Sequence, residues 1–164
     1  MKYMVRKAVS ADLPRIDEIY AFARDFMEKT GNPNQWGKTN PPHEWLVEDI
    51  KNELLHVITD EQGIHGVFYF YIGEDPTYGT IEDGSWHNLD TYGTIHRIAS
   101  DGSGGILRTA VEFCKNYVDH IRIDTHHDNI IMQKAVAKLG FERSGIIHLA
   151  NGSPRIAYEL NIVK

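Results

Sequence analysis

The sequence predicts an α/β fold in which a mixed sheet of about seven strands carries helices on both faces. Segments with strand and helix patterns alternate in the order β-α-α-β-β-insert-β-α-β-α-β-β. Strand–helix–strand units in the second half need parallel neighbours, whereas the turn sequences at residues 60–63 and 151–152 join antiparallel strands. There is no internal repeat or linker, so we expect residues 1–164 to form a single domain.

Composition limits the classes of partner. The formal charge of −6 and the pI near 5.8 argue against nucleic acid, whose phosphates require a basic surface. The lone cysteine, Cys114, excludes an intramolecular disulfide and fits a reducing compartment. The first residues lack the apolar core of a signal peptide, and no run approaches the roughly 20 apolar residues of a membrane span. We therefore expect a cytoplasmic protein with no membrane partner.

The first strand and helix follow from short-range patterns. Residues 3–9 alternate weakly and predict a strand. Ser10 or Asp12 can cap the following helix, Pro14 is tolerated in its first turn, and Gly31 ends it. Its apolar face, at helical spacing, consists of Ile16, Ile19, Tyr20, Ala23, Phe26 and Met27.

Residues 32–42 contain two Asn-Pro steps and a Pro-Pro step, which exclude regular structure. Trp36 within this loop either closes the edge of the core or lines a pocket, and the sequence leaves both open. A second helix is predicted at residues 43–53. Two strands follow, at residues 54–59 and 64–72.

Residues 73–90 are rich in Gly, Asp and Pro and predict a long connection or an extra short hairpin. A strand resumes at residues 92–99 and leads through a glycine loop, residues 101–105, into a helix at residues 106–117. Such a loop can hold a phosphate on its backbone N–H groups, although a plain strand-to-helix turn looks the same. Cys114 falls on the apolar stripe of this helix, which favours a buried hydrophobe over a nucleophile.

The last elements are a strand at residues 121–124, a helix and a hairpin. Asp128 or Asn129 can cap the helix and Gly140 ends it. The hairpin joins strands at residues 141–149 and 155–162.

Two local motifs resemble a known family. Residues 95–100, Ile-His-Arg-Ile-Ala-Ser, are similar to the Leu-His-x-Leu-Ala-Val strand of the Gcn5-related N-acetyltransferase (GNAT) family. Asn129 and the Leu-Gly-Phe at residues 139–141 stand at the separation found in that family's fourth helix. The glycine loop departs from the family's Arg/Gln-x-x-Gly-x-Gly/Ala pattern, with Leu107 in place of the second glycine. Val136 stands where the family usually carries a tyrosine proton donor.

The resemblance implies acetyl-CoA as co-substrate and no metal. Its pyrophosphate would lie on the glycine loop and its pantetheine arm beside the preceding strand, with Lys134 or Lys138 near the adenosine phosphate. The residues implied for this role are Ile98, Ala99, Ser100, Gly102, Ser103, Gly104, Gly105, Ile106, Leu107, Asn129 and Lys134.

Acyl transfer to an amine needs a proton acceptor, because a free amine is mostly protonated at neutral pH. His96 is the candidate base, since imidazole titrates near neutral pH; a half-buried histidine without chemistry is the alternative. His126 is a candidate for the missing acid, and its alternative is a loop anchor. In the family, the backbone N–H near Ala99 would polarise the thioester carbonyl.

The family builds its acceptor pocket from the first two helices, their loop and the middle hairpin. The residues that this implies here are Phe26, Gln35, Trp36, Trp86 and Arg97. Aromatic walls with few charges suit a primary amine on a small molecule or an amino-acid-like acceptor. The resemblance also allows a homodimer.

Two other readings stay open. Val136 in place of tyrosine motivates a catalytically weak or inactive acyl-CoA-binding module on the same fold. Nine histidines, including the cluster His126, His127 and Asp128, motivate a metal hydrolase. Adjacent strand residues point to opposite faces, and no His-Glu-x-x-His or Cys-x-x-Cys spacing is present, so we do not expect a metal.

Overall fold

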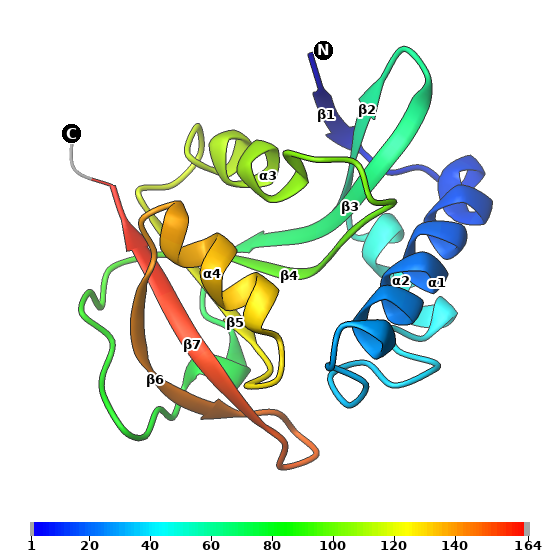
Figure 1. Ribbon diagram of the computed structural model, residues 1–164. Helices are drawn as coiled ribbons and strands as arrows, with labels where there is room; N and C mark the ends of the chain where they lie inside the picture. Colours follow the sequence, from blue (N-terminus) through cyan, green and yellow to red (C-terminus); the bar gives the residue numbers. More distant parts are fainter. Residues whose placement is uncertain (1, 163–164) are drawn as a thin grey trace.

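The structure, a computed structural model, describes residues 2–162. Its centre is a seven-stranded sheet in the order β1-β2-β3-β4-β5-β7-β6, in which β4 and β5 are parallel and the other neighbours antiparallel (Figure 1). The strands are β1 (Met4–Lys7), β2 (Leu55–Asp60), β3 (Gly63–Ile72), β4 (Gly93–Ser100), β5 (His120–Thr125), β6 (Glu142–His148) and β7 (Pro154–Asn161). The helices are α1 (Leu13–Lys29), α2 (His43–Lys51), α3 (Ile106–Cys114) and α4 (Ile130–Lys138). The predicted mixed sheet and element order are confirmed.

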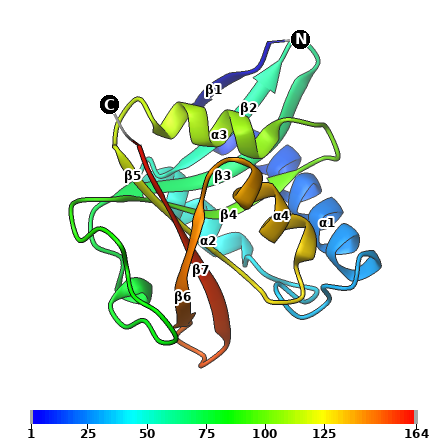
Figure 2. The same cartoon turned by 60° about the vertical axis from the view of Figure 1, so that its left-hand side comes forward.

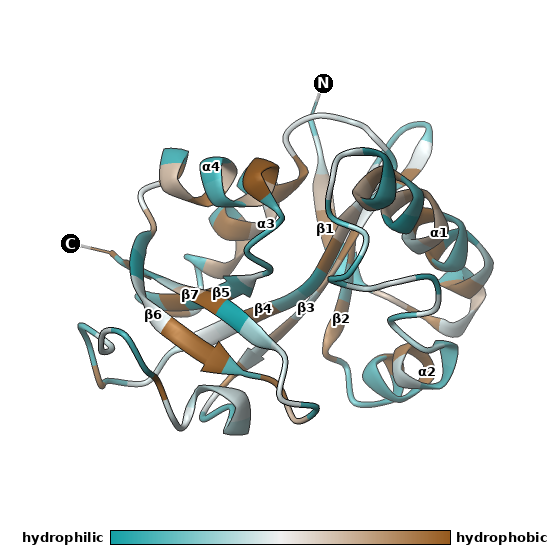
Figure 3. Ribbon diagram, turned by 60° about the horizontal axis from the view of Figure 1, so that its bottom comes forward, coloured by the Kyte–Doolittle hydropathy of each residue, from teal (hydrophilic) through white to brown (hydrophobic). Residues whose placement is uncertain are grey.

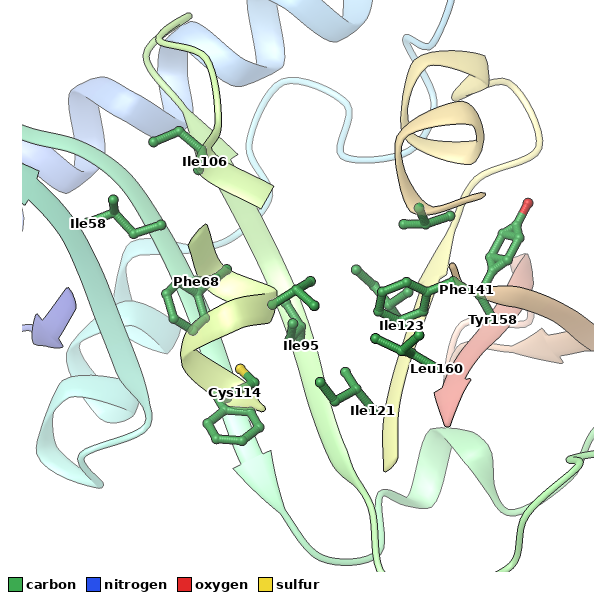
Figure 4. Close-up of a cluster of buried hydrophobic side chains, with 14 residues drawn as sticks. Ile58, Phe68, Ile95, Ile106, Cys114, Ile121, Ile123, Phe141, Tyr158 and Leu160 are labelled. Carbon is green, nitrogen blue, oxygen red and sulfur yellow. The ribbon is translucent and has the colours of Figure 1, made fainter. Parts of the chain in front are cut away.

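Helices cover both faces of the sheet, as predicted (Figures 1 and 2). On one face, α3 and α4 bury the largest apolar cluster, which includes Ile95, Ile121 and Cys114 (Figure 4). On the other face, α1 and α2 pack over β2, β3 and the end of β4. The insert between β3 and β4 covers the remaining part of that face, where Tyr78 and Tyr92 contact Ile147 of β6 and Ala157 of β7. Figure 3 shows the hydrophobic stretches of the strands between these layers.

Several local predictions need correction. Neither Ser10 nor Asp12 caps α1 with its side chain; a 3-10 turn precedes the helix, and the Asp12 carboxylate accepts from Arg6 and from the N–H of Val9 instead. Of the two alternatives predicted for the insert, the long connection is found and the hairpin is not; the insert contains a 3-10 turn, Pro76–Tyr78, and an isolated bridge between Glu82 and Ile146. Asn129 does cap α4, with its Oδ1 accepting from the N–H of Met132 at 3.0 Å.

The parallel pair β4–β5 separates soon after it begins. Its ladder contains Gly93 with Ile121 and Thr94 with Arg122, while β4 runs on to Ser100 and β5 to Thr125. The two carboxyl ends therefore diverge. Backbone groups of β4 beyond Thr94 have no ladder partner on the β5 side within residues 2–162.

A bulge at Arg97 bends β4 within this divergent part. His96 is paired with Tyr69 of β3, and Ala99 is paired with Val67. Between these two pairs β4 advances by three residues and β3 by only two, so β4 carries one extra residue. Arg97 lies in this bulge and has a backbone φ of 52°, an uncommon value for a residue other than glycine. Contacts on both sides hold it: its carbonyl accepts from the Tyr20 hydroxyl at 2.6 Å and its guanidinium pairs with Asp49.

None of the helices in residues 2–162 combines the length and the apolar character that a bilayer span requires.

Candidate active site

Two cavities meet where β4 and β5 diverge. The first, of about 330 Å³, lies between α1, the end of β4, the glycine loop and α4. The second, of about 380 Å³, lies between the loop before α2, the bulge of β4, the end of β5 and the start of β7. The residues common to both linings are Met27, Ile98, Asn129 and Met132.

The glycine loop presents unsatisfied backbone donors. Gly105 precedes α3 with a φ of 80° and, having no side chain, provides no cap. The N–H groups of residues 104–107 donate to no acceptor in residues 2–162. Free N–H groups at the start of a helix, with its positive dipole end, form a binding site for a phosphate.

Three distant side chains hold this loop in place. Tyr3 donates from its hydroxyl to the carbonyl of Gly104 at 2.9 Å. The carboxylate of Asp101 pairs with Arg15 at 2.8 Å and with Nδ1 of His65, also at 2.8 Å. The residue before β1, strand β3 and helix α1 therefore all hold the loop.

The first cavity has mostly apolar walls beyond the loop. Its walls include Phe22 and Phe26 of α1 and Ile131 and Met132 of α4. A long, partly apolar chain fits such a cleft, and the unpaired edge of β4 offers amide and carbonyl groups along one side.

Gln35 connects the irregular loop before α2 to the sheet. Its Oε1 accepts from Nδ2 of Asn32 at 2.9 Å and from Nδ2 of Asn129 at 3.0 Å. Next to it, Trp36 packs edge-on against Tyr20 at a ring-centroid distance of 5.6 Å and also lines the second cavity. Both readings of Trp36 therefore hold: it closes the edge of the core and forms a pocket wall.

His96 lies in the second cavity between two carboxylates. Its Nε2 is 2.8 Å from Oδ2 of Asp75, and its Nδ1 is 3.7 Å from Oδ1 of Asp124. Burial opposes ionisation of Asp75, but hydrogen bonds from His96 and Thr77 outweigh it and lower the pKa of Asp75 to about 2. An ionised Asp75 favours the proton on Nε2, which leaves Nδ1 as an acceptor beside Asp124.

A hydrogen bond from the insert orients the side chain of Asp124. The hydroxyl of Tyr78, in the insert, donates to Oδ1 of Asp124 at 2.6 Å. Burial, and then the neighbouring charge of Asp124, raise the pKa of Tyr78 well above its usual range, so the phenol remains protonated and keeps donating.

His126 lines neither cavity. Its Nδ1 accepts from the N–H of Asp128 at 3.0 Å, the arrangement of a loop anchor. The argument that His126 and His127 point apart does not apply, because β5 ends at Thr125 and both residues lie in a turn, where their rings stack 4.3 Å apart. Together with Asp128 they form a group whose ligand atoms lie within 4.8 Å of one another and that could hold a metal ion.

The other predicted residues divide between the two cavities and the surface. Gln35, Trp36 and Arg97 line the second cavity, whereas Phe26 lines the first. Trp86 lines neither: it stacks on Arg122 at 3.8 Å and packs in the cluster under the insert. Most residues predicted for the cofactor line the first cavity, namely Ile98, Ala99, Ser100, Gly102, Ser103, Ile106, Leu107 and Asn129. Lys134 is exposed on α4 and outside it.

Sequence reasoning missed Asp75, Asp124, Trp45 and Arg155. Alternation along β5 puts Asp124 on the face opposite the core residue Ile123, a signal that was available. Asp75 has no comparable signal, since it comes from an irregular insert.

The solved structures show what this arrangement resembles. A GNAT-family acetyltransferase from Streptococcus agalactiae 2603 superposes with a TM-score of 0.87 and 28% identity, over 99% of this chain and 96% of that one. The chain belongs to the GNAT family.

More distant GNAT structures agree in fold alone. An acetyltransferase from Listeria monocytogenes 4b F2365 gives a TM-score of 0.71 at 18% identity, covering 98% of this chain and 95% of that one. A phosphinothricin acetyltransferase from Sinorhizobium meliloti, solved in complex with AcCoA, gives 0.64 at 16% identity, covering 99% and 89%. No protein-family model matches the sequence, and the search of curated proteins also gave no match. The GNAT assignment therefore rests on three-dimensional structure.

In this GNAT protein, Val136 is fully buried in the core between α4 and the sheet. The position that carries the family's tyrosine, as inferred from the spacing, is thus a packing position here.

Proposed function

We propose that this protein is an N-acetyltransferase that transfers the acetyl group of acetyl-CoA directly to the primary amine of a small or amino-acid-like acceptor. The observation that carries the proposal is the meeting of two cavities at the divergent ends of β4 and β5, with His96 in the second. Acetyl-CoA supplies the activated acyl group as a thioester. The buried, lone Cys114 and the formal charge of −6 fit a cytoplasmic enzyme acting on small molecules.

The first cavity has the chemistry that acetyl-CoA requires. The free N–H groups of residues 104–107 suit its pyrophosphate, and the unpaired edge of β4 near Ile98 and Ala99 suits the amides of its pantetheine arm. Asn129 borders the arm at the junction of the cavities. Lys134 and Lys138 are the candidates for the adenosine phosphate.

In the second cavity, His96 is the proposed base. The acceptor enters as an ammonium, which Asp124 attracts, and Nδ1 of His96 removes a proton so that the amine becomes a nucleophile. The amine nitrogen then forms a bond to the thioester carbon and the C–S bond breaks. CoA leaves as a thiolate that takes up the second proton lost by the amine nitrogen, and His96 returns the first proton to solvent. Asp75 holds the imidazole in the required tautomer. The N–H near Ala99 is the proposed donor to the acyl oxygen. His126 serves as an anchor of the turn before α4 rather than as the acid.

Two measurements test the function together: calorimetry with acetyl-CoA, and thiol release over a panel of primary amines. We expect binding of acetyl-CoA and thiol release with at least one class of amine. His96→Gln should bind acetyl-CoA as the wild type does but turn over about 100-fold more slowly, within the range of general-base catalysis. The burial of Val136 favours one rival, an acyl-CoA-binding module; binding without release for every amine would establish that rival instead.

A further inference from the structure

We propose that the acceptor amine also carries a carboxylate, as an amino acid does, and that Arg155 binds this carboxylate in the second cavity. The inference rests on the proposed acetyl transfer and narrows its substrate class.

Arg155 is a buried cation that forms no ion pair with a carboxylate of the described residues, although the charge of Asp124 acts on it from a greater distance. It lies at the start of β7, is 5% exposed and lines the second cavity. Its Nη1 donates to the Ser153 hydroxyl and to the carbonyl of Pro154, and its Nη2 donates to the carbonyl of Gln35 at 3.1 Å. These acceptors are all neutral, and no carboxylate in the described part of the chain forms an ion pair with it.

A guanidinium remains charged in a protein, so burying it without a counterion costs free energy. The other two arginines of this region avoid that cost. Arg97, on the same cavity wall, pairs with Asp49. Arg122 lies between the rings of Trp86 and Tyr92, 3.8 Å from each. Among residues 2–162, Arg155 has neither a carboxylate in direct contact nor a ring over it, and Asp124 acts on it only at longer range, so a direct counterion can come from the ligand.

The donor geometry of Arg155 also leaves a place for a carboxylate. Two acceptors occupy Nη1 and one occupies Nη2, whereas Nε donates to no group in the described residues. Nε and Nη2 lie on one edge of the guanidinium plane, the edge that grips a carboxylate through two parallel hydrogen bonds.

A negatively charged side chain, Asp124, lies on the same face of the sheet as Arg155. Asp124 of β5 is paired with Ala157 of β7, and Arg155 is two residues from Ala157, so Asp124 and Arg155 project from the same face as diagonal neighbours. Both line the second cavity without touching each other as an ion pair. An ammonium beside Asp124 and His96 and a carboxylate on Arg155 is the charge pattern of a zwitterion. Trp36 and Trp45, on the same lining, form walls for its side chain.

Matched pairs of acceptors test the inference on the wild-type protein. Each pair consists of an α-amino acid and its primary amide, which keeps the amine and the shape but removes the negative charge. Thiol release with saturating acetyl-CoA gives kcat/KM for both members. We expect the acid to be preferred about ten- to hundredfold, the range that a charge-assisted hydrogen bond contributes.

The outcomes separate the two proposals. Amides or simple amines that react as well as the acids overturn the carboxylate inference and leave acetyl transfer intact. No thiol release with any member of the panel overturns the proposed function, and the inference with it.

Substitution of Arg155 assigns the preference to this residue. Arg155→Gln should bring the acid-to-amide ratio close to one while acetyl-CoA affinity stays unchanged, and Arg155→Lys should keep part of the preference. Arg143→Gln, which removes an exposed arginine of β6, is the charge-matched control and should leave the ratio as in the wild type. A folded Arg155→Gln protein with an unchanged ratio overturns the assignment. If that variant fails to fold, the ratio for Arg155→Lys and the wild-type pairs decide.

Discussion

At the residue scale, the orientation of His96 depends on a side chain outside the sheet. The carboxylate of Asp75 accepts from Nε2 of His96 through Oδ2 and from the N–H of Thr77 through Oδ1. The same group thus caps the 3-10 turn of the insert and orients the imidazole. A displacement of the turn would move Asp75, so the two functions are mechanically linked.

Asp75→Asn should separate charge from shape at this position. Asparagine can keep the cap on the N–H of Thr77 through its carbonyl oxygen, but its amide then faces Nε2 and favours the tautomer with the proton on Nδ1. The base would be blocked, and we expect kcat to fall about 100-fold or more with acetyl-CoA affinity retained. Steady-state kinetics and calorimetry measure the two effects.

Glu74→Gln removes a charge from the neighbouring, exposed position and should leave kcat unchanged. Asp75 also has a stability signature. Its pKa is lowered from 3.8 to about 2, so its charge stabilises the fold above pH 3.8, and this contribution disappears as the pH falls toward 2. A full kcat for Asp75→Asn would show that Asp75 does not set the tautomer.

At the element scale, the glycine loop shows what the sequence could and could not provide. The start of the helix at Ile106 was predicted from the apolar stripe and is confirmed. The contacts that hold the loop were not predicted, since Tyr3 lies 101 residues from Gly104 and Arg15 lies 86 from Asp101. No local pattern encodes such distances, whereas the helix start is a local property of the chain.

Gly104→Glu tests the loop as the anion site. A Cβ at this position meets no atom within 4 Å, and Gly104 does not have a positive φ, so the variant should fold. The new carboxylate would stand beside the free N–H groups and repel a phosphate. Calorimetry should show acetyl-CoA affinity reduced roughly tenfold or more, as expected for like charges a few ångström apart near the surface.

Gly104→Ala adds the Cβ without the charge and should bind acetyl-CoA almost as the wild type does. Normal affinity in the glutamate variant would move the pyrophosphate site away from this loop.

His65 should make the anchoring of the loop dependent on pH. Its ring nitrogens contact Asp101 at 2.8 Å and Asp60 at 2.7 Å, and hydrogen bonds to both carboxylates, first Asp101, raise the pKa of His65. A raised pKa means that protonated His65 stabilises the folded state fully below its unfolded value of about 6.5. The contribution is lost as the pH rises through the higher folded value.

The measurement is the free energy of unfolding in urea for the wild type and His65→Gln between pH 5.5 and 9. The difference between them should be largest at the acid end and shrink as the pH rises. His127→Gln, at a position with a 64% exposed side chain, should show a much smaller difference. A gap that widens with pH would mean that neutral His65 is the form that stabilises the loop.

At the scale of the whole molecule, the layers were predictable and the site was only partly so. Helical spacing on α1 and the turn Asn151–Gly152 are local signals, and they led to the correct element order. The bulge at Arg97 carries no local signal, because it depends on contacts with Tyr20 of α1 and Asp49 of α2, and the early end of the β4–β5 ladder carries none either. The cavities lie at these irregularities, which is why their walls combine predicted residues such as Trp36 with unpredicted ones such as Arg155.

A buried carboxylate joins the insert to the sheet. Glu159 of β7 is 1% exposed and accepts from Nε2 of His120 at 2.9 Å, from the N–H of His87 at 2.7 Å and from the hydroxyl of Ser144. Burial opposes its charge, but these donors together lower the pKa of Glu159, so it is ionised. His87 belongs to the insert that also provides Asp75, and Glu159 thereby helps to position that segment.

Glu159→Gln should therefore weaken both the fold and the site. Glutamine keeps the size of the side chain but replaces one acceptor oxygen by a donor, which would face groups that themselves donate. Loss of a charge-assisted hydrogen bond predicts a decrease of about 1.5–3 kcal/mol in the free energy of unfolding, measured in urea. Because the insert is loosened, kcat should fall more than acetyl-CoA affinity. Glu61→Gln, at an exposed position in the turn between β2 and β3, is the control and should change neither. A loss of stability with an unchanged kcat would show that the insert holds Asp75 in place without Glu159.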